Sequence, residues 1–584
     1  MADPGDVDDP TLDREQDRVV EHRGGPLVIT GPAGSGKSEA LARRIAARAS
    51  SGAEPERTLV FTRTPAAASW LRRRVETLLE VPFEELWIGT YATLCERLLR
   101  EYATDAGLDP FFETVGAADR LAILLERIDE LPLRRQEIRG NPAGLLARLL
   151  ERIDALKGEG VSPDALRTWA ADLERDAADG GGHAQRDAAR REIEFAELFG
   201  RHDAIVRDAG SLDSIDLVNE LSRLVERRAD VRDRLAERFT EVIADELEDA
   251  GPPQQRLLEA LAAEHGNLVV VCDELQAIRP LGAPGTLGAF LARHADAERV
   301  TLVGSRRGGG RLARAAAAVT GRNTPMGGDD AGAVRFWRSA TERAEAQAAA
   351  RDIEQLLASG EARPDDICIV TGSVQREGRV MAAALEERSV PFRLTGHGAF
   401  FQRPEIRDAL AWLRVLADPN DAPAAVRALT RPPIELRSVD LARCTLIARR
   451  RKLDMVSALE AAIESPQLPP EARDRIQVFL RLYRPAAGAL EQVRADVFVR
   501  RLIERIGLRR QQLFAASPET AERLVSLSKL GDLAAAFARR EPRSSTRDFV
   551  RYVVAVAEAG ELGDDPPAEG PAGGVLLAGP SATT

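Results

Sequence analysis

Residues 31–38 read Gly-Pro-Ala-Gly-Ser-Gly-Lys-Ser and fit the phosphate-loop pattern G-x-x-x-x-G-K-[ST]. An apolar run, residues 27–30, precedes them, and a stretch of helical character, residues 38–49, follows. Strand, glycine loop and helix therefore come in the order that phosphate binding requires. We expect a nucleotide site that holds ATP and Mg²⁺ through the eight loop residues: Gly31, Pro32, Ala33, Gly34, Ser35, Gly36, Lys37 and Ser38.

The acidic groups that such a loop needs for hydrolysis follow another apolar run. Residues 242–244 read Val-Ile-Ala, and Asp245 and Glu246 come next. Hydrolysis needs a carboxylate that holds Mg²⁺ and a group that positions or activates water. We therefore expect Asp245 to ligate the metal together with Ser38, and Glu246 to act as the base. Two surface acids after a core strand are the alternative, which the glycine loop disfavours.

Length and composition exclude several classes of protein. At 584 residues the chain predicts three to five domains, since a domain has roughly 100–200 residues. Charged residues make up 30% and no apolar run is long enough for a bilayer helix, which predicts a cytoplasmic protein without a membrane partner. The formal charge of −12 argues against a globally basic nucleic-acid binder but leaves room for a basic groove on one face.

Several segments resemble motifs of the UvrD/Rep-type superfamily 1A DNA helicases. Residues 12–16, Leu-Asp-Arg-Glu-Gln, are similar to the segment whose glutamine contacts adenine. Residues 61–67 resemble the single-strand contact motif F-T-x-x-A-A, and residues 89–91 resemble G-T-[FY]. The resemblance implies that Gln16 binds the base and that DNA is contacted by four residues: Thr62, Arg63, Thr90 and Tyr91.

Later segments extend the resemblance along most of the chain. Residues 245–249 resemble the D-E-x-Q-D box, and residues 272–278 resemble G-D-x-x-Q-S-I, whose glutamine senses the γ-phosphate. Residues 302–307 stand where the family has L-x-Q-N-Y-R. Residues 400–408 and 418–421 are close to F-F-x-R-x-E-I-x-D and P-N-D, the most family-specific stretch. The resemblance implies five catalytic residues: Lys37, Asp245, Glu246, Gln276 and Arg307.

The sequence departs from the family pattern at several of these positions. Glu248 replaces the glutamine of the acidic box, and Arg306 replaces a tyrosine that stacks near the adenine, although a guanidinium can also stack on a ring. Residues 279–283 replace an aromatic-rich track. Because base–aromatic stacking is worth about 1–3 kcal/mol per base, this predicts a weaker grip on single strands unless Trp70 or Tyr91 substitutes.

The largest departure is at the C-terminal end. Residues 576–584 stand where relatives have h-h-T-h-H-x-A-K-G, without its histidine and lysine, and no motif with a second γ-phosphate arginine follows. An arginine of this kind contributes about 10³–10⁵ in rate in phosphoryl transfer. We therefore expect a C-terminally truncated second motor domain.

The resemblance implies an α/β fold class, with two RecA-like P-loop domains that have parallel sheets and each carry a mostly helical insertion. It implies an ATP-dependent helicase that translocates on single-stranded and partly duplex DNA in repair or recombination, with a nuclease or repair protein as a further partner. Arg44 joins the expected nucleotide contacts. The alternatives are a degenerate helicase-like subunit that binds DNA and ATP without unwinding, and an ATPase of another P-loop class, against which residues 400–408 argue.

The expected domain organisation combines the strand pattern with this resemblance. Apolar β-type runs at residues 27–30, 58–62, 86–89, 241–244, 267–272 and 367–370 alternate with segments of helical period, whereas two long stretches show helical period only. The expected parts are a disordered tail (1–10), domain 1A (11–95 and 213–330), helical insertion 1B (96–212), an incomplete domain 2A (331–415 and 575–584), helical insertion 2B (416–559) and a flexible linker (560–574).

Overall fold

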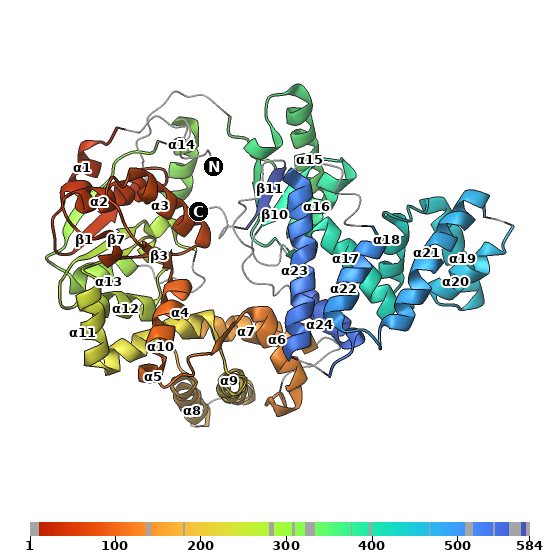
Figure 1. Cartoon of the computed structure of the whole chain (residues 1–584), viewed down its shortest axis with the longest axis horizontal. Helices are drawn as coiled ribbons and strands as arrows, with labels where there is room; N and C mark the ends of the chain where they lie inside the picture. The colour runs from red at the N-terminus through yellow and green to blue at the C-terminus, as the bar shows by residue number, and fades with distance from the viewer. Residues whose placement is uncertain are drawn as a thin grey trace. The chain divides into compact units, whose positions relative to one another are not determined.

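The computed structural model describes residues 11–135, 142–178, 182–278, 285–306, 310–321, 333–374, 377–395, 400–466, 468–507, 518–540, 543–559 and 574–579. The chain divides into two compact units (Figure 1). Unit 1 contains residues 1–140 and 148–337, and unit 2 contains residues 141–147 and 338–584. The expected tail and nearly all of the expected linker lie outside the described residues. Among the described helices, none is both long enough and apolar enough to cross a bilayer.

Unit 1 is built on a six-stranded sheet with the strand order β3-β2-β6-β7-β1-β8. Every neighbouring pair in this sheet is parallel, so the carboxyl ends of all six strands meet at one edge. The strands are β1 (Leu27–Thr30), β2 (Thr58–Thr62), β3 (Trp87–Thr90), β6 (Glu241–Ala244), β7 (Leu268–Cys272) and β8 (Glu298–Thr301).

Helices cover both faces of this sheet because its strands are apolar on both sides. Leu27 and Ile29 of β1 point to the face covered by α1, α2 and α3, whereas Val28 points to the face covered by α4 and α10–α13. Figure 1 shows α1, α2 and α3 together beside β1. The covering helices are α1 (Arg14–Glu21), α2 (Lys37–Ser50), α3 (Pro65–Leu78), α4 (Tyr91–Glu101), α10 (Ser214–Arg227), α11 (Ala229–Arg238), α12 (Pro252–Ala262) and α13 (Thr286–Arg293).

The expected insertion 1B is mostly helical but contains strand that the sequence pattern does not predict. Two three-residue strands, β4 (Glu113–Val115) and β5 (Ser211–Asp213), pair in parallel across about a hundred residues of chain. Runs this short have no readable alternation, so they carry no strand signal. The remaining helices of unit 1 are α5 (Ala103–Ala106), α6 (Ala117–Glu126), α8 (Pro163–Ala178), α9 (His183–Asp208) and α14 (Gly310–Thr320), together with α7 (Pro142–Gly158) from residue 148 onward.

A buried charge cluster ties α7 to the segment that leads into α10. Lys157 is 3% exposed, and its Nζ lies 2.9 Å from Asp203, 2.8 Å from Asp213 and 2.8 Å from Asp216. Arg120 lies 3.2 Å from Asp213, so a second cation joins the cluster. Because an unpaired buried charge is costly, these groups stabilise the fold only as a set.

Unit 2 has a three-stranded parallel sheet with the strand order β10-β11-β9. Its strands are β9 (Cys368–Val370), β10 (Phe392–Thr395) and β11 (Val575–Ala578), so the last described residues lie in the middle strand. The helices are α15 (Glu342–Ser359), α16 (Glu377–Glu387), α17 (Pro404–Ala417), α18 (Ala422–Thr430), α19 (Ser438–Arg451), α20 (Met455–Ile463), α21 (Pro470–Ala489), α22 (Ala495–Arg505), α23 (Pro518–Arg540) and α24 (Thr546–Ala559). Short 3-10 helices occur at Pro55–Arg57, Ile128–Glu130, Leu247–Asp249 (η3), Glu274–Gln276 (η4), Pro364–Asp366 and Phe400–Gln402.

Candidate nucleotide-binding site

The glycine loop joins β1 to α2 at the carboxyl edge of the unit 1 sheet. Gly34 and Gly36 have φ of +76° and +83°, which L side chains rarely adopt. A Cβ on Gly36 would lie 2.4 Å from Gln16 Nε2, and a Cβ on Gly31 would lie 2.6 Å from Ser35 Oγ. Glycine is therefore required here both by backbone conformation and by space.

Lys37 is the first residue of α2, so the N–H groups at this helix start face the loop. Its Nζ donates to the carbonyl oxygens of Gly31 at 2.9 Å and Pro32 at 3.1 Å. The ammonium group thus lies over the loop, where the helix dipole also favours an anion. This arrangement suits the phosphates of a nucleotide.

Ser38 and Asp245 meet although 207 positions separate them in the chain. The Ser38 hydroxyl donates to Asp245 Oδ2 at 3.1 Å, and the Asp245 N–H donates to Phe61 O at 2.9 Å, which fixes the residue at the end of β6. Asp245 is 5% exposed, and burial raises its pKa. A hydroxyl and a buried carboxylate are hard oxygen donors of the kind that Mg²⁺ takes, and a cation would offset the buried charge, so these residues fit the expected metal.

Glu246 has an unusual backbone and a cationic neighbour. Its φ and ψ are 59° and 50°, a left-handed conformation that is rare for glutamate. Arg63 Nε lies 3.4 Å from Glu246 Oε2 and 3.4 Å from Asp249 Oδ2. Burial and the adjacent Asp245 raise the pKa of Glu246 to about 6, while Arg63 lowers it. A carboxylate held in this way can accept a proton from water near neutral pH.

Contacts join the acidic segment after β6 to the segment after β7. Glu248 Oε2 accepts from the N–H of Asp273 at 3.0 Å, and Asp249 Oδ1 accepts from the N–H of Ile278 at 2.8 Å. Gln276 Nε2 donates to Asp273 Oδ2 at 2.7 Å. Burial raises the pKa of Glu248 to about 7. Gln276 is therefore two contacts away from the acidic segment.

Gln16 lies against the glycine loop with no exposed surface. Its Nε2 donates to Ser35 O at 3.2 Å, and its Oε1 accepts from the N–H of Asp13 at 3.1 Å and from Arg306 Nη2 at 2.8 Å. The backbone N–H of Arg306 also donates to the backbone carbonyl oxygen of Gly34 at 2.9 Å. The structure thus brings Arg306 to the loop, where its side chain is 43% exposed. Arg307, the expected γ-phosphate arginine, lies outside the described residues.

Arg44 has a different environment from the one expected for a nucleotide contact. The side chain is 1% exposed and lies 2.7 Å from Glu241. Its Nη1 donates to Val19 O at 2.9 Å and His22 O at 2.6 Å. These bonds hold α2 against α1 and β6, so we correct the expectation and leave Arg44 out of the nucleotide contacts.

The four expected DNA contacts lie at the carboxyl ends of β2 and β3, but three of them are buried. The Thr62 hydroxyl donates to Thr64 O at 3.2 Å and Gly89 O at 3.3 Å, and the Thr90 hydroxyl caps α4 by accepting from Thr93 N at 3.2 Å. Tyr91 stacks on Phe61 with 4.8 Å between ring centres. Only Arg63, 18% exposed, reaches the surface, and the other three shape the loops around it.

Sequence reasoning missed the polar contacts around Gln16. Asp13 is the N-cap of α1, and its carboxylate accepts from Gln16 N at 2.8 Å. The spacing of Asp13 and Gln16 is that of a capping box, which was a readable signal. The same carboxylate accepts from Arg306 Nη2 at 3.0 Å, a contact across 293 positions that no local pattern shows.

Comparisons with known proteins agree with this geometry. The family model "UvrD/REP helicase N-terminal domain" matches residues 12–279, and "UvrD-like helicase C-terminal domain" matches residues 320–462. The chain belongs to the UvrD/Rep-type helicases. DNA helicase II of Escherichia coli is 26% identical over 94% of this chain and 74% of its own length. ATP-dependent DNA helicase UvrD1 of Mycobacterium tuberculosis is 27% identical over 94% and 73%. ATP-dependent DNA helicase PcrA of Bacillus subtilis is 24% identical over 94% and 72%.

This family membership accounts for the two α/β units of the fold. The N-terminal match, residues 12–279, contains five of the six strands of the unit 1 sheet and the expected helical insertion, while β8 lies beyond it. The C-terminal match, residues 320–462, begins near the end of unit 1 and extends into unit 2. The α/β fold class with parallel sheets, expected from the sequence, is confirmed. The positions of the insertion domains and the roles of individual site residues stay predictions.

Proposed function

We propose that this chain is an ATP-dependent DNA helicase that translocates on single-stranded DNA, with DNA repair or recombination as its setting. The contact between Ser38 and Asp245 at 3.1 Å carries the proposal, since it joins the glycine loop to the acidic segment. Family membership supports DNA as the substrate. A nuclease or repair partner and a cytoplasmic location stay predictions.

The reaction assigned to this site is hydrolysis of the γ-phosphate of ATP. The loop N–H groups and Lys37 bind the phosphates and offset their charge. Ser38 and Asp245 would hold Mg²⁺, which would offset the negative charge that develops on the phosphates during transfer. Glu246 accepts the proton of the attacking water as its oxygen bonds to phosphorus and the bond to the ADP oxygen breaks. ADP and phosphate are the products.

Two side chains, Gln276 and Arg63, would link the presence of the γ-phosphate to DNA binding. Gln276 contacts Asp273, whose N–H is held by Glu248 in the acidic segment. Arg63 contacts Glu246 from the loop after β2, which is expected to touch DNA. A change at the γ-phosphate is therefore within two or three contacts of the DNA-facing loop.

A strand-separation assay tests this function. A partial duplex with single-stranded tails on either end, one strand labelled, is incubated with the chain and either ATP or a non-hydrolysable analogue. We expect displaced strand only with ATP, and none from Lys37→Ala. An absence of displacement with ATP, in a chain that still binds ATP and DNA, would support the helicase-like subunit that does not unwind.

A further inference from the structure

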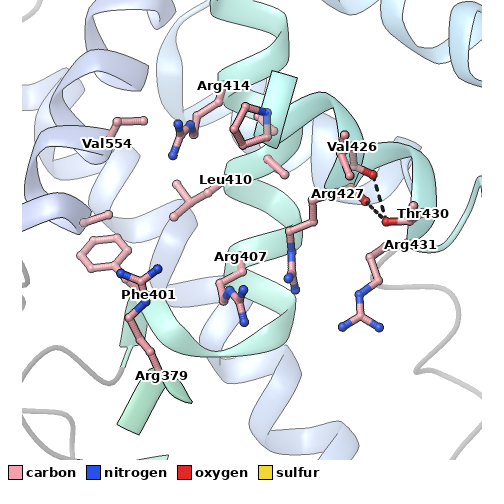
Figure 2. Close-up of a pocket in the computed structure, with 14 residues that line it drawn as sticks. Arg379, Phe401, Arg407, Leu410, Arg414, Val426, Arg427, Thr430, Arg431 and Val554 are labelled. Atoms are coloured by element: carbon pink, nitrogen blue, oxygen red, sulfur yellow. Dashed lines mark hydrogen bonds between the residues drawn. The ribbon is translucent and has the colours of Figure 1, made fainter. Parts of the chain in front are cut away.

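A cavity of about 680 Å³ in unit 2 is unusually rich in cationic side chains (Figure 2). Helices α16, α17 and α18 supply most of its wall, and Val554 and Ala557 of α24 contribute apolar surface. The family resemblance and the proposed ATP site give this cavity no ligand. Five arginines line it: Arg379, Arg407, Arg414, Arg427 and Arg431.

The helical repeat explains why these arginines gather. Arg407, Leu410, Ala411 and Arg414 follow one another along α17 at spacings of three, one and three residues, so they share one face of that helix. Arg427, in the last turn of α18, and Arg431, just after it, are four positions apart and share a second face. Figure 2 shows these side chains together with Arg379 of α16. The cavity therefore lies where two arginine-bearing helix faces meet.

The carboxylates nearby do not balance these charges. The side chains of Arg379 and Arg407 form no hydrogen bond or ion pair with any residue that the structure describes. Burial and the neighbouring Arg427 and Arg379 lower the pKa of Arg407 to about 10, and Asp408 only partly opposes this. Three of the five arginines do have partners: Arg414 with Asp421 at 2.7 Å, Arg427 with Asp408 at 2.7 Å, and Arg431 with Glu386.

A second hollow of about 820 Å³ shares the same two arginines. Arg379 and Arg407 line both, and Arg343 of α15 adds another cation to the second one. Its acidic residue, Glu387, accepts from Gln347 Nε2 at 2.6 Å. Arg379 and Arg407 thus stand between two open volumes, which gives room for a ligand that carries more than one phosphate.

We propose that Arg379 and Arg407 bind phosphate groups of a nucleotide or of a nucleic-acid strand in this cavity, as a second anion site distinct from the glycine loop. A guanidinium matches a phosphate because its N–H groups can donate two parallel hydrogen bonds. Phe401, Leu410 and Val554 lie in the same wall and suit the apolar part of a nucleotide better than they suit a bare ion. The shared chemistry is a phosphate ester, supplied by DNA or by a free nucleotide.

The experiment compares the double variant Arg379→Gln/Arg407→Gln with the control Arg481→Gln/Arg484→Gln, which removes the same charge from α21. Binding of a labelled oligothymidylate is measured by fluorescence anisotropy at several NaCl concentrations. Binding of ADP is measured by calorimetry in chains that also carry Lys37→Ala, to weaken the glycine-loop site. Both readouts need no hydrolysis, so they stay interpretable if the proposed helicase function fails.

If DNA is the ligand, the double variant Arg379→Gln/Arg407→Gln binds oligothymidylate at least about tenfold more weakly than the parent chain, as expected for lost charge-assisted hydrogen bonds. The negative slope of log affinity against log salt becomes shallower by about 1.4, since two phosphate contacts are lost and each single-strand contact contributes about 0.7. If a free nucleotide is the ligand, DNA binding is unchanged and ADP binding in the Lys37→Ala background is lost. Either result supports the proposal.

The proposal is overturned if DNA and ADP binding both match the control variant. A further variant, Arg379→Lys/Arg407→Lys, separates charge from packing. If DNA is the ligand, this lysine variant keeps both positive charges and is expected to keep the salt slope of the parent chain. A fall in that slope as large as the fall in the glutamine variant would also overturn the proposal. Thermal unfolding of each variant verifies that unit 2 remains folded.

Discussion

Arg63 Nε lies 3.4 Å from Glu246 Oε2, so the one partly exposed residue among the expected DNA contacts touches the residue that we propose as the base. Arg63 also lies 3.4 Å from Asp249 Oδ2. A DNA phosphate that draws the guanidinium toward itself would therefore change the surroundings of Glu246. This gives a short physical route by which DNA binding can alter ATP hydrolysis.

The first prediction concerns this ion pair. Arg63→Gln should raise ATP turnover without DNA and lower the ratio of DNA-stimulated to basal turnover, because Glu246 is then free of the guanidinium at all times. A partly exposed ion pair worth about 0.5–1 kcal/mol corresponds to a change of about 2–5-fold. Steady-state ATPase assays with and without oligothymidylate check this, with Arg18→Gln, another ion-paired arginine of unit 1, as the control. An unchanged ratio contradicts the proposed route.

The second prediction concerns the metal. Asp245→Asn should weaken the apparent affinity for Mg²⁺ at least about tenfold, because it removes the charged ligand, and Ser38→Ala should have a smaller effect. The measurement is ATP turnover against Mg²⁺ concentration at fixed ATP. If Mg²⁺ dependence in Asp245→Asn matches that of the parent chain, Asp245 is not a metal ligand.

Sequence reasoning located the site because its parts follow strands with strong apolar signals. The runs at residues 27–30, 58–62 and 241–244 coincide with β1, β2 and β6, and the segments that follow these strands supply Ser38, Arg63 and Asp245. Parallel order then brings these loops to one edge. Strands such as β4 (Glu-Thr-Val) and β10 (Phe-Arg-Leu-Thr) were missed, because polar residues interrupt them and they lack the continuous apolar run that marks β1.

The rest of the site depends on contacts that no local pattern records. Arg44 stands in the helix after the glycine loop, yet its side chain turns inward to Glu241, which is 197 positions away. Tyr91 directly follows β3, but its ring stacks on Phe61 in the core. The burial of these side chains follows from packing between distant segments, and a motif fixes only their places in the chain.

The third prediction concerns the pH dependence of stability. Burial raises the pKa of Glu248 from 4.5 to about 7, so the folded state holds this proton more tightly than the unfolded state. Stability from this group is present below pH about 4.5 and is lost as pH rises toward 7, by up to about 3 kcal/mol. Glu248→Gln cannot ionise and can still accept from Asp273 N, so it should unfold later than the parent chain at pH 8 but not at pH 5.

Urea unfolding of the parent chain and Glu248→Gln at both pH values checks this prediction. Glu354→Gln, which alters an exposed carboxylate in unit 2, is the control. Equal differences between parent and variant at pH 5 and pH 8 would show that Glu248 does not carry the pH dependence.

The fourth prediction concerns the buried cluster around Lys157. Lys157→Met leaves Asp203, Asp213 and Asp216 close together without their shared cation. Breaking a buried ion pair in this way costs about 3–5 kcal/mol. We expect a clear fall in the urea midpoint of unit 1, partly recovered by Lys157→Arg. A loss below about 1 kcal/mol would mean that the carboxylates take up protons or water at little cost.

The most direct test of the central claim is ATP turnover of the parent chain and of Glu246→Gln, each with and without single-stranded DNA, beside a direct measurement of ATP binding. We predict that the parent chain hydrolyses ATP faster with DNA, and that Glu246→Gln binds ATP equally well but turns over at least about a hundredfold more slowly, as expected for a lost general base. Equal turnover in the two chains, or none in a parent chain that binds both ATP and DNA, would contradict the account.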